Sequence, residues 1–173
     1  MMIGARTAAW AKNVPENLFK FPTSVVGVPI QSPSTVFTPV LDAWNQSFAW
    51  NGYGYGYMSP VVDFSSSHLK TKISSAGGSS AYGLTVFFKL EKNTEYKFHT
   101  DLNTDSGAII VTSLEDAGDG KVKFASARLT SIYGNDAVFT TLNSDSVKYY
   151  AFIFVPPVDG SERTYSNMRL EKV

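Results

Sequence analysis

An aromatic-rich stretch between residues 44 and 57 offers the clearest binding chemistry in this sequence. Two tryptophans precede three tyrosines that alternate with glycines, and the set comprises Trp44, Trp50, Tyr53, Tyr55 and Tyr57. Indole and phenol rings combine a large apolar face with a polar edge, so they pack well against the C–H faces of sugar rings. In a strand the three tyrosines would share one side, and the glycines would leave their rings uncovered. We therefore predict a ligand-binding platform at these five residues. The same rings could instead fill the core or a subunit interface, where Trp and Tyr are also enriched.

Catalytic motifs are absent from the sequence. Without cysteine there is no thiolate nucleophile, no disulfide and no zinc–thiolate site. The run Gly77–Ala81 fails the G-x-S-x-G nucleophile pattern at its fifth residue, and Gly118–Lys121 lacks the flanking residues of a P-loop. His68 and His99 are far apart, and His99 is expected on the solvated face of a strand. We expect no catalytic residues. A glycan hydrolase, which needs only two suitably spaced carboxylates, is the weaker alternative.

One oxygen-rich segment, Asp101–Asp105, has the alternation of a calcium-binding loop, but the pattern breaks immediately. Ser106 stands where an EF-hand has glycine, and Thr112 stands where it has its bidentate glutamate. Turns capped by Asp and Asn side chains explain this segment better, and the same holds for Asp116 and Asp119. We therefore expect no metal site and no cofactor.

The charge balance argues against polyanionic partners. Fifteen basic residues offset fifteen acidic ones in a chain of 173 residues, and no Lys/Arg cluster appears. Neither nucleic acid nor an anionic membrane surface is expected as a partner. The opening residues lack the apolar core of a signal peptide, and no window approaches the length of a membrane span. We expect synthesis in the cytoplasm without a signal peptide.

Short strands joined by Gly, Ser, Asn and Asp turns account for most of the sequence. Residues alternate in polarity over 86–90 and 96–102, on either side of a turn at 91–93, which predicts a β-hairpin or strand pair. Segment 121–130 changes phase near Phe124, which predicts a bulge. Segment 147–155 is apolar on both faces, as expected for a central strand covered on both sides.

The strand count decides the fold class. About 8–11 strands with less than roughly 10% helix predict an all-β antiparallel β-sandwich of the jelly-roll type. The last strand, 164–171, is predicted to place Ser166, Met168 and Leu170 on one face. Residues 1–16 have no strand pattern and are predicted to form an N-terminal arm that attaches to an assembly, while residues 17–173 form the sandwich domain.

Three segments of the second half resemble parts of carbohydrate-binding-type jelly rolls. Leu90–Phe98 (LEKNTEYKF) is similar to their L-x-x-N-T-x-Y-x-F turn and strand. Phe139–Thr141 with Tyr149–Phe154 resembles their F-T-T motif and penultimate strand, and Tyr165–Lys172 (YSNMRLEK) resembles their closing strand. The resemblance covers residues 83–173, and the matching residues are mostly of core and turn type. The closing glycine of the family is missing, because Val173 follows Lys172.

Domains of this kind are frequent in phage and prophage tail and baseplate proteins. The resemblance therefore implies a non-catalytic virion protein of the tail or receptor-binding apparatus, with a carbohydrate-binding-like domain that contacts host-surface glycans. The partners it implies are other virion subunits, further copies of the chain in a homo-oligomer, and a host glycan. The alternative is a purely structural head or tail protein without a glycan site. Exposed rings at 44–57 would favour the first hypothesis, and buried rings would favour the second.

Overall fold

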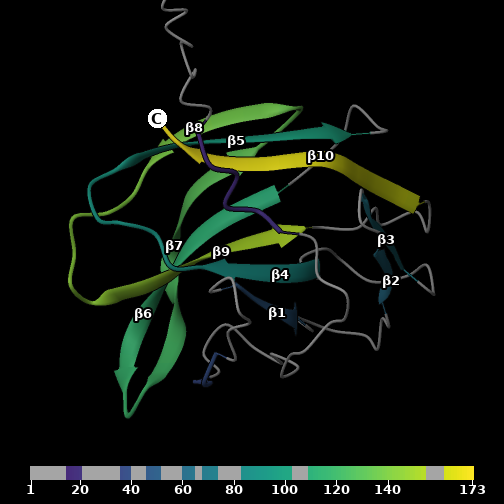
Figure 1. Cartoon of the computed structure of the whole chain (residues 1–173). Coiled ribbons are helices and arrows are strands. Elements are labelled where there is room, and N and C mark those ends of the chain that lie inside the picture. Colours follow the sequence, from purple (N-terminus) through teal and green to yellow (C-terminus); the bar gives the residue numbers. More distant parts are fainter. Residues whose placement is uncertain are drawn as a thin grey trace, which may run out of the picture.

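The computed structural model is built from β-strands in two layers (Figure 1). It describes residues 15–20, 36–39, 46–51, 60–64, 68–73, 83–102, 109–154 and 162–173. Every regular element within these ranges is a strand, and none of them is helical. The prediction of an all-β fold is therefore confirmed.

Ten strands form two five-stranded sheets in which every pairing is antiparallel. The first sheet has the order β1 (Gln46–Asn51), β4 (Gly83–Phe88), β9 (Val147–Phe154), β6 (Ile109–Gly118) and β7 (Lys121–Ile132). The second sheet has the order β2 (Pro60–Phe64), β3 (His68–Ile73), β10 (Glu162–Lys172), β5 (Glu95–Leu102) and β8 (Asp136–Thr140).

The connections give the sandwich its jelly-roll character. From β3 onward the chain changes sheet at every step except the β6–β7 hairpin. Strand β2 lies near β4 on one side of the sandwich, and β7 lies near β8 on the other. The edge strands β7 and β8 therefore lie close together on one side, and edge strand β2 lies near the second strand of the other sheet on the opposite side.

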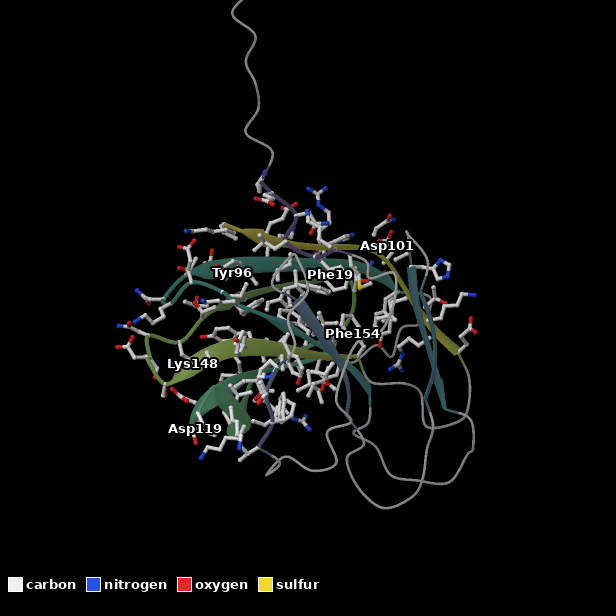
Figure 2. All side chains as sticks on the ribbon, turned by 60° about the horizontal axis from the view of Figure 1, so that its bottom comes forward. Phe19, Tyr96, Asp101, Asp119, Lys148 and Phe154 are labelled. Carbon is white, nitrogen blue, oxygen red and sulfur yellow. The ribbon has the colours of Figure 1, made fainter. Side chains whose placement is uncertain are left out.

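The main core lies between the sheets and is rich in phenylalanine. Phe152 in β9 contacts Phe88 and Phe98 with ring centroids 5.1 and 5.4 Å apart, respectively. Phe19 and Phe154 also lie between the layers (Figure 2), with their ring centroids 6.3 Å apart. Alternate residues of β4 and β9 belong to this core, because successive side chains of a strand point to opposite faces of the sheet.

A second apolar cluster covers the outer face of the first sheet. It consists of Phe37, Phe87, Leu114, Val122 and Ala151. Phe37 forms a β-bridge with Val122, with N–O distances of 3.0 and 2.8 Å, and its ring lies 5.5 Å from that of Phe87. Strand β9 is thus covered on both faces and lies third in a five-stranded sheet. This confirms the prediction that 147–155 forms a central strand.

Residues 17–19 belong to the sandwich. Asn17 binds β10 twice, because its Nδ2 donates to Met168 O at 3.1 Å and its Oδ1 accepts from Leu170 N at 3.0 Å. Leu18 N donates to Leu170 O at 2.8 Å, and Phe19 is buried in the main core. The backbone beside the second half of β10, beyond its pairing with β3, is therefore occupied by residues 17–19.

The structure corrects two sequence predictions and confirms a third. Segments 86–90 and 96–102 do not form a hairpin, because β4 pairs with β1 and β9 whereas β5 pairs with β10 and β8. Each strand buries one face in the shared core, so alternation alone could not identify its partner. In β10, a bulge between Ser166 and Arg169 brings Tyr165 into the core in place of Ser166. The predicted bulge in β7 is present, as a register shift between Phe124 and Thr130.

Candidate functional site

The aromatic stretch begins in an edge strand. Trp50 lies in β1, opposite Leu84 of β4, and Phe48 lies opposite Val86, a residue of the main core. Trp44, Tyr53, Tyr55 and Tyr57 lie outside the described residues. The Tyr–Gly repeat connects β1 of the first sheet to β2 of the second, and both are edge strands. In the sequence, the repeat therefore lies between an edge strand of one sheet and an edge strand of the other.

The outer face of the first sheet is closed by packing. In β4 Thr85 and Phe87 are fully buried, and in β9 Ala151 is fully buried. Ile110 and Ile153, which are cross-strand partners, are 9% and 7% exposed. A sheet with one solvated face would alternate between buried and exposed residues. Here both positions of the alternation are buried, so these residues leave no open apolar surface for a ligand.

The outer face of the second sheet is polar and carries a chain of charged contacts. His99 of β5 lies between two aspartates, with Nδ1 3.1 Å from Asp136 Oδ1 and Nε2 3.4 Å from Asp101 Oδ1. Lys97 Nζ lies 3.3 Å from Asp136 Oδ1, and Asn167 Nδ2 donates to Asp101 Oδ2. The chain of contacts therefore runs across β8, β5 and β10.

The electrostatics of this network follow from its geometry. The hydrogen bond with His99, and after it the one with Lys97, holds the pKa of Asp136 below its ordinary value of 3.8. His99 lies on the polar face of its strand, as expected, but its side chain is only 32% exposed. Sequence reasoning missed both aspartates as partners, since Asp136 is 37 positions from His99. Within the described residues, no group of three or more His, Asp or Glu side chains is arranged so that it could hold a metal ion.

The acidic turn between β6 and β7 is stabilised by a hydrogen bond between a side chain and the backbone of the turn itself. Asp116 Oδ1 accepts a hydrogen bond from Gly118 N at 2.9 Å, and Asp116 Oδ2 lies 3.2 Å from Lys148 Nζ. The Gly118 amide, and then Lys148, lower the pKa of Asp116. Asp119 lies at the tip with a φ of 53° (Figure 2). The geometry of Asp116 is that of a capped turn, as predicted.

The residues that carry the family resemblance are structural. Thr141 Oγ1 accepts from Thr94 N at 2.9 Å and donates to Glu91 O at 2.6 Å. Asn93 has a φ of 47°, the left-handed conformation that asparagine tolerates better than most residues. The N-T and F-T-T motifs therefore hold the same turn together from two sides. These motifs specify the fold and say nothing about a ligand.

Two buried tyrosine hydroxyls accept hydrogen bonds from the backbone next to the turn that Thr141 stabilises. Tyr96 OH accepts a hydrogen bond from Glu91 N at 3.0 Å, and Tyr150 OH accepts one from Leu142 N at 2.7 Å. Burial raises the pKa of Tyr150 above its ordinary value of 10.0. Both phenols act as structural hydrogen-bond partners.

Exposed rings are scarce among the residues whose burial is described. Tyr133, between β7 and β8, is the only exposed aromatic side chain in that set, at 73%. Phe124 and Tyr149 are half-buried against the second apolar cluster. No helix in the described ranges is long and apolar enough to span a membrane.

Comparison with known proteins gives similarity at the level of strand arrangement. No protein-family model matches the chain, and no curated protein matches it significantly. Similar solved structures include a carbohydrate-binding module of family 4, with 13% identity over 81% of this chain and 96% of that chain and a TM-score of 0.42. The second N-terminal cellulose-binding domain of Cellulomonas fimi β-1,4-glucanase C has 15% identity over 72% and 84%, with a TM-score of 0.39.

A phage protein is also among the similar structures. The enzymatically active domain of tailspike protein 4 from bacteriophage CBA120 has 6% identity and a TM-score of 0.45. The match covers 75% of this chain but 19% of that one. The assignment of this chain to the antiparallel jelly-roll β-sandwiches rests on its own two sheets.

Proposed function

We propose that this chain is a non-catalytic glycan-binding domain of a phage tail or receptor-binding apparatus, and that it contacts host-surface glycans. The position of the aromatic stretch carries the proposal. In the sequence, Tyr53, Tyr55 and Tyr57 lie between two strands, β1 and β2, that are each an edge strand of a sheet. The main core between the sheets already contains a dense set of phenylalanine rings.

Two further observations support the binding function. The chain has no net charge, which suits a neutral ligand such as a sugar better than a polyanion. Several carboxylates of the described residues are paired with basic side chains, including those of Asp116 and Asp145. A paired carboxylate with a lowered pKa is a poor general acid, so we propose no catalytic step. The phage context rests on the sequence resemblance.

Glycan-array binding combined with melting curves tests the proposal. If Tyr55 belongs to a sugar platform, Tyr55→Ala should weaken binding by about 0.5–1.5 kcal/mol with little loss of stability. If its ring is buried, the same change should cost about 3–5 kcal/mol of stability. Trp50→Ala is tested in parallel. Tyr133→Ala, which removes an exposed ring on the opposite side of the sandwich, is the matched control and should change neither quantity.

A purely structural virion role is the second candidate. It is favoured by the register of β1, in which Phe48 lies opposite the core residue Val86. In that case, both Trp50→Ala and Tyr55→Ala should destabilise the domain or its oligomer, and no array glycan should bind. Mass spectrometry of density-purified phage particles tests the virion assignment for both candidates. Absence of the chain from particles that contain other tail proteins would reject it.

A further inference from the structure

The hairpin of β6 and β7 ends in an Asp–Gly turn that projects beyond the other strands (Figure 1). Gly118 of β6 pairs with Lys121 of β7, so the turn has two central residues, Asp119 and Gly120. Both have a positive φ, which is 53° at Asp119 and 72° at Gly120. This is the pattern of a type I′ turn, for which Asp–Gly is one of the preferred pairs.

The turn is open to solvent. Asp119 and Gly120 are both exposed, and a Cβ added at Gly120 would meet no described residue within 4 Å apart from its two chain neighbours. The hydrogen bond of such a turn joins its first and fourth residues, so it does not use the Gly120 amide. Asp116 differs, because its Oδ1 accepts a hydrogen bond from Gly118 N at 2.9 Å and its Oδ2 lies 3.2 Å from Lys148 Nζ.

We propose that Asp119 is a site of spontaneous isomerisation to isoaspartate. The backbone nitrogen of Gly120 attacks Cγ of the protonated Asp119 carboxyl group, and the new N–Cγ bond closes a five-membered succinimide ring. The amide proton and the carboxyl hydroxyl leave together as one water molecule, which is taken up again when the ring opens. Cleavage of the N–Cγ bond regenerates aspartate, whereas cleavage at the backbone carbonyl carbon gives isoaspartate, whose main chain runs through Cγ.

Two features of the turn favour ring closure at this position. Glycine hinders the attack least, because it has no Cβ beside the attacking nitrogen. Ring closure also requires Asp119 to leave the turn conformation, and a left-handed φ is unfavourable for aspartate whereas glycine adopts it freely. Asp116 has neither feature, since alanine follows it and its carboxylate is held by Gly118 and Lys148. The reaction involves no glycan, so this inference is independent of the proposed function.

Ageing of the folded, full-length protein at physiological pH and temperature tests the proposal. Isoaspartate is detected by methyl transfer from S-adenosylmethionine with an isoaspartate methyltransferase, and it is located by tryptic mapping with electron-transfer fragmentation. Trypsin places Asp119 in the peptide 98–121, apart from the second Asp–Gly pair of the sequence at 159–160, which lies outside the described residues. Isoaspartate should accumulate at Asp119 and form at least about tenfold more slowly at Asp116, an internal control in the same peptide.

Asp119→Asn is the matched variant. Asn–Gly is also a preferred pair for this turn, so the fold should be kept and the circular dichroism spectrum unchanged. The same succinimide should form at least about tenfold faster, because a neutral amide is attacked more readily than a carboxylate. Isoaspartate that is absent from position 119 of the aged protein, or that forms equally fast at Asp116, would overturn the proposal. A folded Asp119→Asn variant that forms no isoaspartate would also overturn it, because the turn would then block ring closure.

Discussion

Thr141 is a single residue whose hydroxyl joins two segments far apart in the sequence. It is 3% exposed and hydrogen-bonded to Thr94 N, Thr94 O and Glu91 O. Thr141→Val keeps the shape but leaves buried partners unsatisfied, which should cost about 1–3 kcal/mol. Urea denaturation measures the loss. Thr140→Val, at the exposed neighbouring position, should change stability by less than about 0.5 kcal/mol, and an equal loss there would contradict the assigned role.

Asp136 makes the stability depend on acidity. Its pKa is lowered in the folded state, first by the hydrogen bond with His99 and then by Lys97. Its contribution is therefore present above the ordinary pKa of 3.8 and is lost as pH falls through the lowered value. Asp136→Asn should lose a few tenths of a kcal/mol at neutral pH, since the group is exposed. In urea melts at a series of pH values, this difference should vanish in acid. A difference that persists below that range would contradict the pairing.

The bulge in β10 sets the orientation of the last strand. Asn167 has a φ of 50°, and both Tyr165 and Met168 enter the core although they are three positions apart. Glycine adopts this conformation freely, whereas a β-branched residue does so at a cost of about 1–3 kcal/mol. Asn167→Val should therefore be markedly less stable than Asn167→Gly in chemical denaturation. Equal stabilities would mean that the bulge can relax. Both variants remove the contact with Asp101, so the difference in stability between them reports the backbone effect alone.

Strand positions were predictable because each strand alternates or is apolar throughout. The β6, β8 and β9 segments and the bulge in β7 could be located from hydrophobic pattern alone. Strand partners could not, since alternation is the same in a hairpin and in two stacked sheets. The bulge at Asn167 could not be predicted either, because a single inserted residue changes the sequence pattern too little.

Among the described residues, Phe37 covers part of the outer face of the first sheet by packing against Phe87. The residue is 6% exposed and is flanked by the exposed Val36. Phe37→Ala should cost about 3 kcal/mol and uncover apolar surface that binds the dye ANS. Val36→Ala is the matched control and should change neither stability nor dye fluorescence. If Phe37→Ala leaves both unchanged, the second cluster does not depend on this ring.

Two truncations test the boundary between the N-terminal arm and the sandwich domain. Pro15 and Glu16 are exposed, whereas Asn17 and Phe19 bind β10 and the core. Deleting residues 1–16 should leave stability nearly unchanged and abolish incorporation into the particle. Deleting residues 1–19 should cost at least about 3–5 kcal/mol, since Phe19 is lost with the Asn17 bonds. Thermal melts and particle proteomics measure the two effects. A large loss from the shorter deletion would place residues 1–16 in the fold.

The candidate site was harder to predict from the sequence than the fold was. Of the five aromatic residues predicted to bind ligand, Trp50 lies on β1 and the other four lie outside the described residues. Rings of the same type serve cores and ligand sites, so residue type could not separate these roles. The network around His99 escaped prediction for a different reason. Its members come from three strands, and only strand pairing reveals that they are neighbours.

The bonds between Asn17 and β10 also constrain when the protein can fold. Asn17 and Leu170 are 153 positions apart, and β10 lies in the middle of the second sheet. At 5–20 residues per second, a ribosome needs roughly 8–30 s to synthesise the chain between them. Throughout that interval the second sheet has no centre, and β5 and β3 expose edges that β10 will later cover. Folding of the nascent chain therefore depends on β10, and these edges favour aggregation until that strand has been synthesised.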